Sequence, residues 1–116
     1  MKHLHLFREA KGPIEDSNPA PDRIVSGTPT GQDISVFDSK DGRILSGIWR
    51  ATTGAWRVRY EETEYCYVTK GSARLISDDG AEKLVSRGDG FVIESGFSGI
   101  WEVLEEMEKH YMIVLP

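Results

Sequence analysis

The sequence lacks three features that would place it in other classes of protein. It has one cysteine in 116 residues, so no disulfide can form within the chain and a reducing compartment is expected. It has no apolar run long enough to cross a membrane and no signal-peptide pattern. Its formal net charge of −5 and its lack of basic runs argue against a protein that binds nucleic acid. We therefore expect a cytoplasmic protein with no membrane partner and no nucleic-acid partner.

Histidine, the commonest ligand of transition metals, is also scarce, with three in the whole chain. His3 and His5 have the spacing of a metal pair on one face of a strand, but no third ligand is visible near them. The simpler interpretation is an exposed terminal strand, which we favour. No metal and no other cofactor is expected.

What the chain does have is a rhythm of short β-prone runs between glycine and aspartate turns. Twelve glycines and five prolines interrupt it, and no segment has a helical period. Eight or more short strands joined in this way predict one domain with a jelly-roll barrel or sandwich fold. The expected strands cover residues 1–7, 33–38, 43–52, 55–60, 64–68, 73–77, 82–85, 91–93, 100–104 and 111–115, with a charged turn or short helical turn at residues 105–108.

The segment over residues 8–32 is different, because it is rich in Pro, Gly, Asp, Ser and Asn. It predicts an extended arm, with Ile24 and Val25 as its anchors. Such an arm needs a surface to lie on, which is either the barrel itself or a β-edge of a second subunit. The expected organisation is an N-terminal strand and arm over residues 1–33 and a barrel over residues 34–116.

The functional interpretation depends most on residues 64–71. Strand alternation puts Glu64, Cys66 and Val68 on one face. If that face is inside a barrel, Glu64 is an ionisable group in the interior, which is costly unless it is paired, protonated or bound to something. The alternative is a buried acid satisfied by tyrosine or backbone donors, without a function.

The motifs around this stretch resemble those of cupins. Cupins carry a first motif in which two histidines precede a glutamate and a glycine ends the next strand. Their second motif has Gly-Asp, a proline-glycine bend and a third histidine. Glu64 and Gly71 have the spacing of the first motif, while Gly88, Asp89 and Gly96 match the second.

A closer resemblance is to the small single-domain cupins related to the cupin domain of (S)-ureidoglycine aminohydrolase, in the RmlC-like cupin superfamily. It implies an all-β, RmlC-like cupin jelly-roll barrel (a double-stranded β-helix) with an extended N-terminal arm, and a homodimer. The residues that carry it are Gly47, Ile48, Trp49, Gly54, Trp56, Glu64, Cys66, Tyr67, Gly71, Gly88, Asp89, Gly96, Trp101, Lys109, His110 and Tyr111.

The chain departs from the cupin pattern at the metal ligands. The first two histidine positions fall on Arg57 and Arg59 in one register, or on Val58 and Tyr60 in the other. The third position falls on Gly99, so no register supplies a histidine. The motif glutamate is the only ligand left, and one carboxylate does not hold a transition metal. This argues against the manganese-assisted deamination that the resemblance would imply.

Without a metal, the expected interior is an aromatic cavity with a few polar groups, which suits a small organic ligand. We favour the register that points Trp56, Val58 and Tyr60 inward, because that face of the strand is more apolar. The predicted catalytic pair is Glu64, as general acid or base, with Lys109 as its electrostatic partner. The predicted ligand-binding residues are Trp56, Tyr60, Cys66, Trp101 and Tyr111.

Simpler interpretations stay open for several of these residues. Cys66 is also explained as a small core hydrophobe, and alternation alone leaves Lys109 free to face solvent. Trp49 is expected in the core rather than at the cavity.

Four functional hypotheses follow from the sequence. The first is a metal-independent cupin that binds, or binds and transforms, a small nitrogenous or carboxylate metabolite. The second is a non-catalytic ligand-binding or accessory dimeric module, and the third is a metal-assisted aminohydrolase-like enzyme. The fourth is a structural dimer whose cavity is filled by aromatic side chains. The sequence does not decide between an enzyme and a binding protein.

Overall fold

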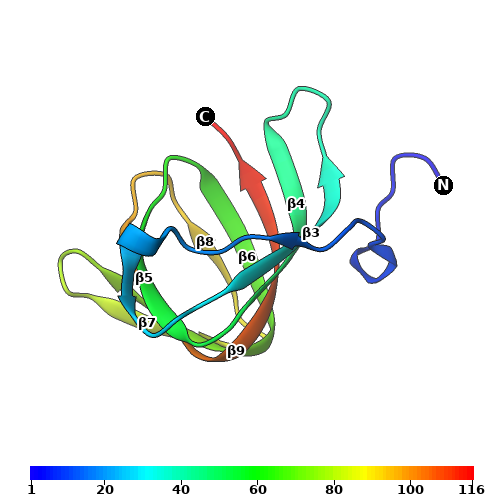
Figure 1. The fold of residues 1–116 in the computed structure, drawn as a ribbon. Coiled ribbons are helices and arrows are strands. Elements are labelled where there is room, and N and C mark those ends of the chain that lie inside the picture. Colours follow the sequence, from blue (N-terminus) through cyan, green and yellow to red (C-terminus); the bar gives the residue numbers. More distant parts are fainter.

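The computed structural model describes residues 1–116, and nearly all of its regular structure is β-strand (Figure 1). The predicted all-β jelly-roll architecture is confirmed. The only helical turns are two 3-10 turns of three residues, η1 (Phe7–Glu9) and η2 (Pro21–Arg23). The strands are β1 (Glu15–Asp16), β2 (Ile24–Ser26), β3 (Gly31–Asp38), β4 (Ile44–Ala51), β5 (Gly54–Arg59), β6 (Thr63–Ser77), β7 (Glu82–Ser86), β8 (Gly90–Ile93) and β9 (Ser98–Val114).

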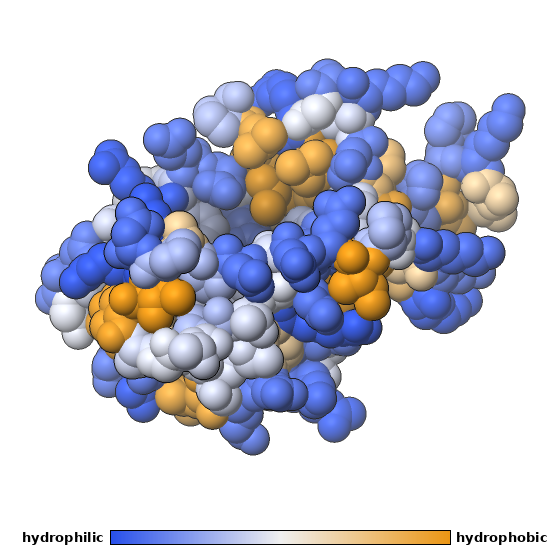
Figure 2. Space-filling view, in the orientation of Figure 1, coloured by the Kyte–Doolittle hydropathy of each residue, from blue (hydrophilic) through white to orange (hydrophobic).

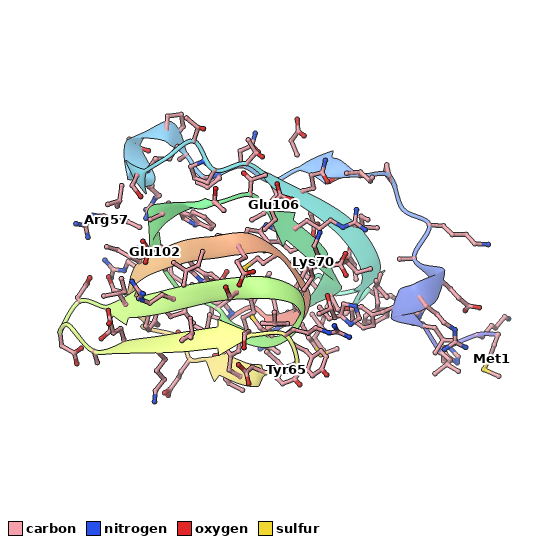
Figure 3. The ribbon with its side chains drawn as sticks, turned by 90° about the horizontal axis from the view of Figure 1, so that it is seen from below. Met1, Arg57, Tyr65, Lys70, Glu102 and Glu106 are labelled. Carbon is pink, nitrogen blue, oxygen red and sulfur yellow. The ribbon has the colours of Figure 1, made fainter.

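The longest strand, β9, connects the two sides of the barrel. Its C-terminal half pairs with β4 and its N-terminal half with β5, while β6 pairs along almost its whole length. The strands β7 and β8 then pair with β6, and every pair is antiparallel. Viewed from below, β6 and β9 curve together around the interior (Figure 3). The core therefore lies within the curl of a single sheet.

The two long strands correct the prediction at two places. Gly71 was expected to end a strand, and residues 105–108 were expected to form a turn, but β6 and β9 run through both positions. The pairing shifts register between Val68 and Ala73, with Gly71 in a left-handed conformation at φ +79°. Glycine is typical of a β-bulge as well as of a turn, so the sequence pattern wrongly predicted that the strand ends at Gly71.

The predicted N-terminal strand at residues 1–7 is also wrong. Residues 1–6 form no strand, and Phe7 begins η1. Aromatic contacts hold this segment instead, since Phe7 stacks on His110 at 4.4 Å between ring centroids and His5 lies 4.9 Å from Phe37. Alternation produces a strand only where a neighbouring edge supplies hydrogen bonds, and no strand pairs with this segment.

The arm lies across the barrel of its own chain. At one end β1 pairs with β3, and at the other end β2 pairs with β5, so residues 17–23 cross between these two strands (Figure 1). Of the two predicted anchors, Ile24 is half-buried and pairs with Trp56, whereas Val25 is half-exposed. Figure 2 shows that this face is mainly hydrophilic, with apolar side chains in small separate groups.

The core combines apolar side chains from both long strands with four buried polar residues, Ser46, Glu64, Ser72 and Lys109. Only Glu64 and Lys109 among these carry a charge. The apolar cluster consists of Ala51, Trp56, Cys66, Val68, Ala73, Val85, Ile93, Trp101, Val103 and Met107.

We predict that Gly71→Ala destabilises the fold more than Gly80→Ala does. Both glycines have positive φ, so alanine costs about 1–2 kcal/mol at either position. A Cβ at Gly71 would lie 2.1 Å from the backbone oxygen of Glu106, whereas a Cβ at Gly80 meets nothing within 4 Å. Urea unfolding of the two variants measures the difference, and equal losses would contradict the bulge as a close backbone contact.

Candidate functional site

The site is built by the inward faces of the two long strands. On β6 these residues are Glu64, Cys66 and Val68, and on β9 they include Lys109 and Tyr111. Cys66 pairs with Tyr111 and Val68 pairs with Lys109, so side chains from both strands share one face. Strand alternation predicted that Glu64, Cys66 and Val68 share one face, and the structure shows that this face is the buried one.

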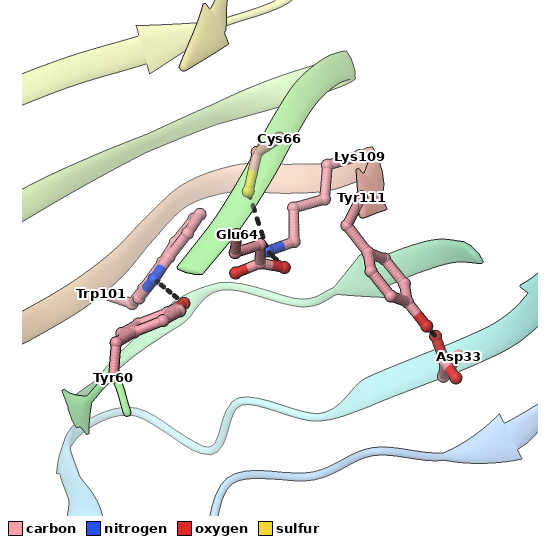
Figure 4. A network of polar contacts seen from close by, with 7 residues as sticks. All are labelled: Asp33, Tyr60, Glu64, Cys66, Trp101, Lys109 and Tyr111. Atoms are coloured by element: carbon pink, nitrogen blue, oxygen red, sulfur yellow. Dashed lines mark hydrogen bonds and ion pairs between the residues drawn. The ribbon is translucent and has the colours of Figure 1, made fainter. Parts of the chain in front are cut away.

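Glu64 and Lys109 form a buried ion pair at the centre of this face (Figure 4). Lys109 Nζ lies 3.1 Å from Glu64 Oε2, and both side chains are only 6% exposed. The same ammonium donates to Cys66 Sγ at 3.5 Å. The sequence left Lys109 free to face either way, and the structure places it inside.

Two tryptophans lie against the Lys109 ammonium. Its Nζ is 4.7 Å from the ring centroid of Trp101 and 4.9 Å from that of Trp49, which is within the range of a cation–π interaction. Trp49 was predicted to be core only, but it lines the cavity together with Trp56 and Trp101. The signal that could have placed it there is its pairing with Lys109 across β4 and β9.

Charge and burial shift the pKa values of the groups around the pair. Burial is the largest effect and alone would lower the pKa of Lys109, but the charge and hydrogen-bond contributions of Glu64 and Cys66 together raise this pKa above its ordinary value. The lysine is therefore held as an ammonium. Burial, partly opposed by that ammonium, raises the pKa of the Cys66 thiol to about 12. The thiol therefore stays protonated at neutral pH.

Two tyrosines extend the polar network, each through one hydrogen bond. Trp101 Nε1 donates to Tyr60 Oη at 3.0 Å, and Tyr111 Oη donates to Asp33 Oδ1 at 2.7 Å. Burial raises the pKa of both hydroxyls, with further contributions from Glu64 at Tyr60 and from Asp33 at Tyr111. Asp33 was not predicted as a site residue, because it lies at the end of the arm rather than in a barrel motif.

The ion pair lies on the wall of a cavity of about 440 Å³. The arm contributes to its lining through residues 17–19 and Arg23. Of the predicted site residues, Cys66 does not reach the cavity and lies fully buried behind Lys109. The predicted residues that do line it are Trp56, Tyr60, Glu64, Trp101, Lys109 and Tyr111.

The donors at the site do not fit a transition metal. No group of three or more His, Cys, Asp or Glu side chains lies close enough together to hold one. Of the two registers for the missing histidines, Val58 and Tyr60 pack against the core. Arg57 is exposed and its side chain points away from the barrel (Figure 3), although it also contributes to the lining of the cavity. The ammonium of Lys109 already pairs with Glu64, so a metal would also meet a like charge.

The chain matches one family model over most of the barrel. That model is described as an EutQ-like cupin domain, and it matches residues 38–111, which is more than half of the chain. The chain belongs to the EutQ-like cupin family. No curated protein matches it.

Solved structures of other cupins share the fold. A Pseudomonas syringae pv. tomato protein of unknown function from the DUF861 family has a TM-score of 0.81 and 18% identity over 91% of this chain. The EutQ protein of Clostridium difficile has a TM-score of 0.67 and 18% identity over 75% of the chain. The cupin described here spans 46% of the first protein and 64% of the second.

A third solved structure is close to this cupin in length. It is a Salmonella typhimurium protein described as an ethanolamine utilization protein Q, with a TM-score of 0.67 and 12% identity. The likeness covers 90% of the chain and 96% of that protein. At these identities the three likenesses show the fold alone.

The structure contains no helix with the length and apolar character that a membrane-spanning helix needs.

We predict that Glu64→Gln costs about 3–5 kcal/mol of unfolding free energy, because it leaves the Lys109 ammonium buried without its partner. Adding Lys109→Met to that variant should recover part of the loss. Because the folded-state pKa of Lys109 is raised, the stabilisation is fully present below its ordinary value of 10.5 and is lost as the pH rises through the raised value. Urea unfolding at neutral and alkaline pH measures both effects.

The matched control for this experiment is Glu102→Gln. Its partner is Arg74 at 3.0 Å, but these side chains are 31% and 40% exposed. Breaking an exposed pair should cost less than about 1 kcal/mol. Equal losses in Glu64→Gln and Glu102→Gln would contradict the buried pair as a strong interaction.

We also predict that Cys66 resists alkylation in the folded protein. At pH 9.0, the ordinary pKa of a cysteine, half of an exposed thiol would react as thiolate, whereas the folded-state pKa is about 12. The side chain is also fully buried. Labelling by iodoacetamide, followed by mass spectrometry with and without denaturant, checks this, and equal rates in the two conditions would refute it.

Proposed function

We propose that this cupin binds a small nitrogenous or carboxylate metabolite in the barrel cavity, through Glu64 and Lys109 and without a metal. The observation that carries the proposal is a buried ion pair that lies on the wall of a cavity. Burying two charges costs several kcal/mol per ion, and well-packed apolar residues would often serve stability as well or better. Contact with a ligand would explain why this buried ion pair is present.

The free hydrogen-bonding capacity of the pair supports this class of ligand. Lys109 uses one N–H toward Glu64 Oε2 and a second toward Cys66 Sγ, which leaves a third. Tyr60 and Cys66 also lie close to the Glu64 carboxylate, and neither of its oxygens is a buried unsatisfied atom. A ligand with an N–H donor beside a carbonyl or carboxylate oxygen could bind both groups at once.

The rest of the lining supports a ligand with a flat or apolar body. The rings of Trp49, Trp56 and Trp101 form an aromatic wall, with ring centroids 5.9–6.5 Å apart. Aromatic surface with a few polar groups is typical of small-molecule sites. The cavity volume of about 440 Å³ lies in the usual range for such ligands.

If the bound ligand is also transformed, the pair has the groups for acid–base chemistry. Glu64 would take a proton from an N–H or C–H of the ligand, and the fixed ammonium of Lys109 would stabilise negative charge that develops on a neighbouring oxygen. The non-catalytic module of the second hypothesis uses the same cavity without this step. Analysis of the ligand after incubation with the protein distinguishes the two.

The finer assignments stay predictions from the sequence. These are the relation to the (S)-ureidoglycine aminohydrolase cupin domain, the homodimer, the cytoplasmic location, and the expected lack of nucleic-acid and membrane partners. EutQ is the name of two of the solved structures, and we infer no substrate of this chain from that name.

The test is a binding screen followed by variants of the pair. Small carboxylates, amides and ureas are titrated into the protein and followed by NMR. For a ligand that binds, Glu64→Gln or Lys109→Met should weaken the affinity about tenfold or more. The control Glu102→Gln, which makes the same chemical change on the outer face, should leave the affinity unchanged. Equal affinities for all three variants would contradict the proposed site.

A further inference from the structure

The charged end of Lys109 is surrounded by groups from three different strands. Glu64 Oε2 and Cys66 Sγ, both on β6, lie 3.1 Å and 3.5 Å from Nζ. The ring centroid of Trp49 on β4 lies 4.9 Å away, and that of Trp101 on β9 lies 4.7 Å away. A carboxylate beside two indole faces is the chemistry by which proteins recognise ammonium ions.

We propose that Glu64, Trp49 and Trp101 form a preformed ammonium-binding site, which a lysine of the same chain fills. We call these three residues the ammonium cage. The role of Lys109 is then to supply a fixed positive charge beside the cavity. The cage itself would accept any small alkylammonium ion if the lysine side chain were shortened.

The cage is held by the barrel rather than by the lysine. Trp101 is 2% exposed and packs against Phe91 and Trp56, with ring centroids 6.3 Å and 6.5 Å away. Trp49 contacts Trp101 at 6.0 Å with their rings 63° apart, which is an edge-to-face arrangement. Glu64 is fixed by the pairing of β6 with β8 and β9. Contacts other than those to the lysine therefore position the three cage residues.

The composition of the cage favours an ammonium ion over a metal ion. The cage offers one carboxylate, and the nearby Cys66 thiol stays protonated because burial raises its pKa. Divalent transition metals need three or four charged or lone-pair donors, whereas a desolvated ammonium gains from aromatic faces. The stem of Lys109 is also long enough to pass Cys66 on the neighbouring strand and reach Glu64.

The experiment uses Lys109→Ala with n-propylammonium, which has the same heavy atoms as the removed part of the side chain. We expect n-propylammonium chloride to raise the Tm of this variant in a saturable way, by about 4 °C or more. Sodium chloride at equal ionic strength and n-propanol are the comparisons, and both should have smaller effects. The wild-type protein, whose cage is filled, should respond to n-propylammonium no more than to sodium chloride.

The double variant Glu64→Gln/Lys109→Ala separates a cation site from a simple hole. In this variant the preference for n-propylammonium over n-propanol should disappear, because the carboxylate is gone. Equal stabilisation of Lys109→Ala by n-propanol and n-propylammonium would overturn the proposal, since it would show cavity filling alone. No response to either compound would overturn it as well.

Lys109→Ala could also fail to fold without an additive. Refolding from denaturant in the presence of each compound then gives the answer. The proposal requires refolding with n-propylammonium and not with n-propanol, and refolding with neither compound would contradict it. These measurements involve no metabolite. They can therefore contradict the ammonium cage without contradicting the proposed function, and the metabolite screen can contradict the proposed function without contradicting the cage.

Discussion

The pairing of β6 with β9 is the constraint on which the rest of this structure depends. It runs along almost the whole length of both strands, and β4, β5, β7 and β8 all join the sheet through one of the two. The same register decides which side chains meet inside the barrel. Val68 opposite Lys109 and Cys66 opposite Tyr111 fix the direction in which the lysine extends. A slip of one residue in either strand would turn a charged side chain outward.

The electrostatics of the interior follow from that register. One positive and one negative group are brought together where both side chains are only 6% exposed, and two indole rings flank the positive one. Each charge alone would be very costly at this depth, so the two are stable only as a unit. The barrel thus places a cation beside Glu64, the residue that resembles the glutamate of the cupin motif.

The fold and the inward face of β6 could be predicted because both depend on local pattern. Alternation places Glu64, Cys66 and Val68 on one face, and turn residues mark most strand ends. The breaks expected at Gly71 and at residues 105–108 were wrong, because a bulge and a turn use the same residues. Trp49 and Asp33 reach the site through pairing between strands distant in sequence, which single-strand periodicity does not contain. For the same reason the depth of Cys66 behind Lys109 could not be predicted.

The arm makes one part of the cavity wall less stable than the rest. Residues 17–23 cross between two very short pairings, two residues of β1 on β3 and three residues of β2 at β5. Asn18 adds one hydrogen bond, accepted from the backbone N–H of Gly31 at 2.9 Å. Such a segment opens locally at a much lower free energy than the barrel. Opening of the arm would remove the part of the cavity wall that residues 17–19 and Arg23 supply, while the part supplied by the barrel stays in place.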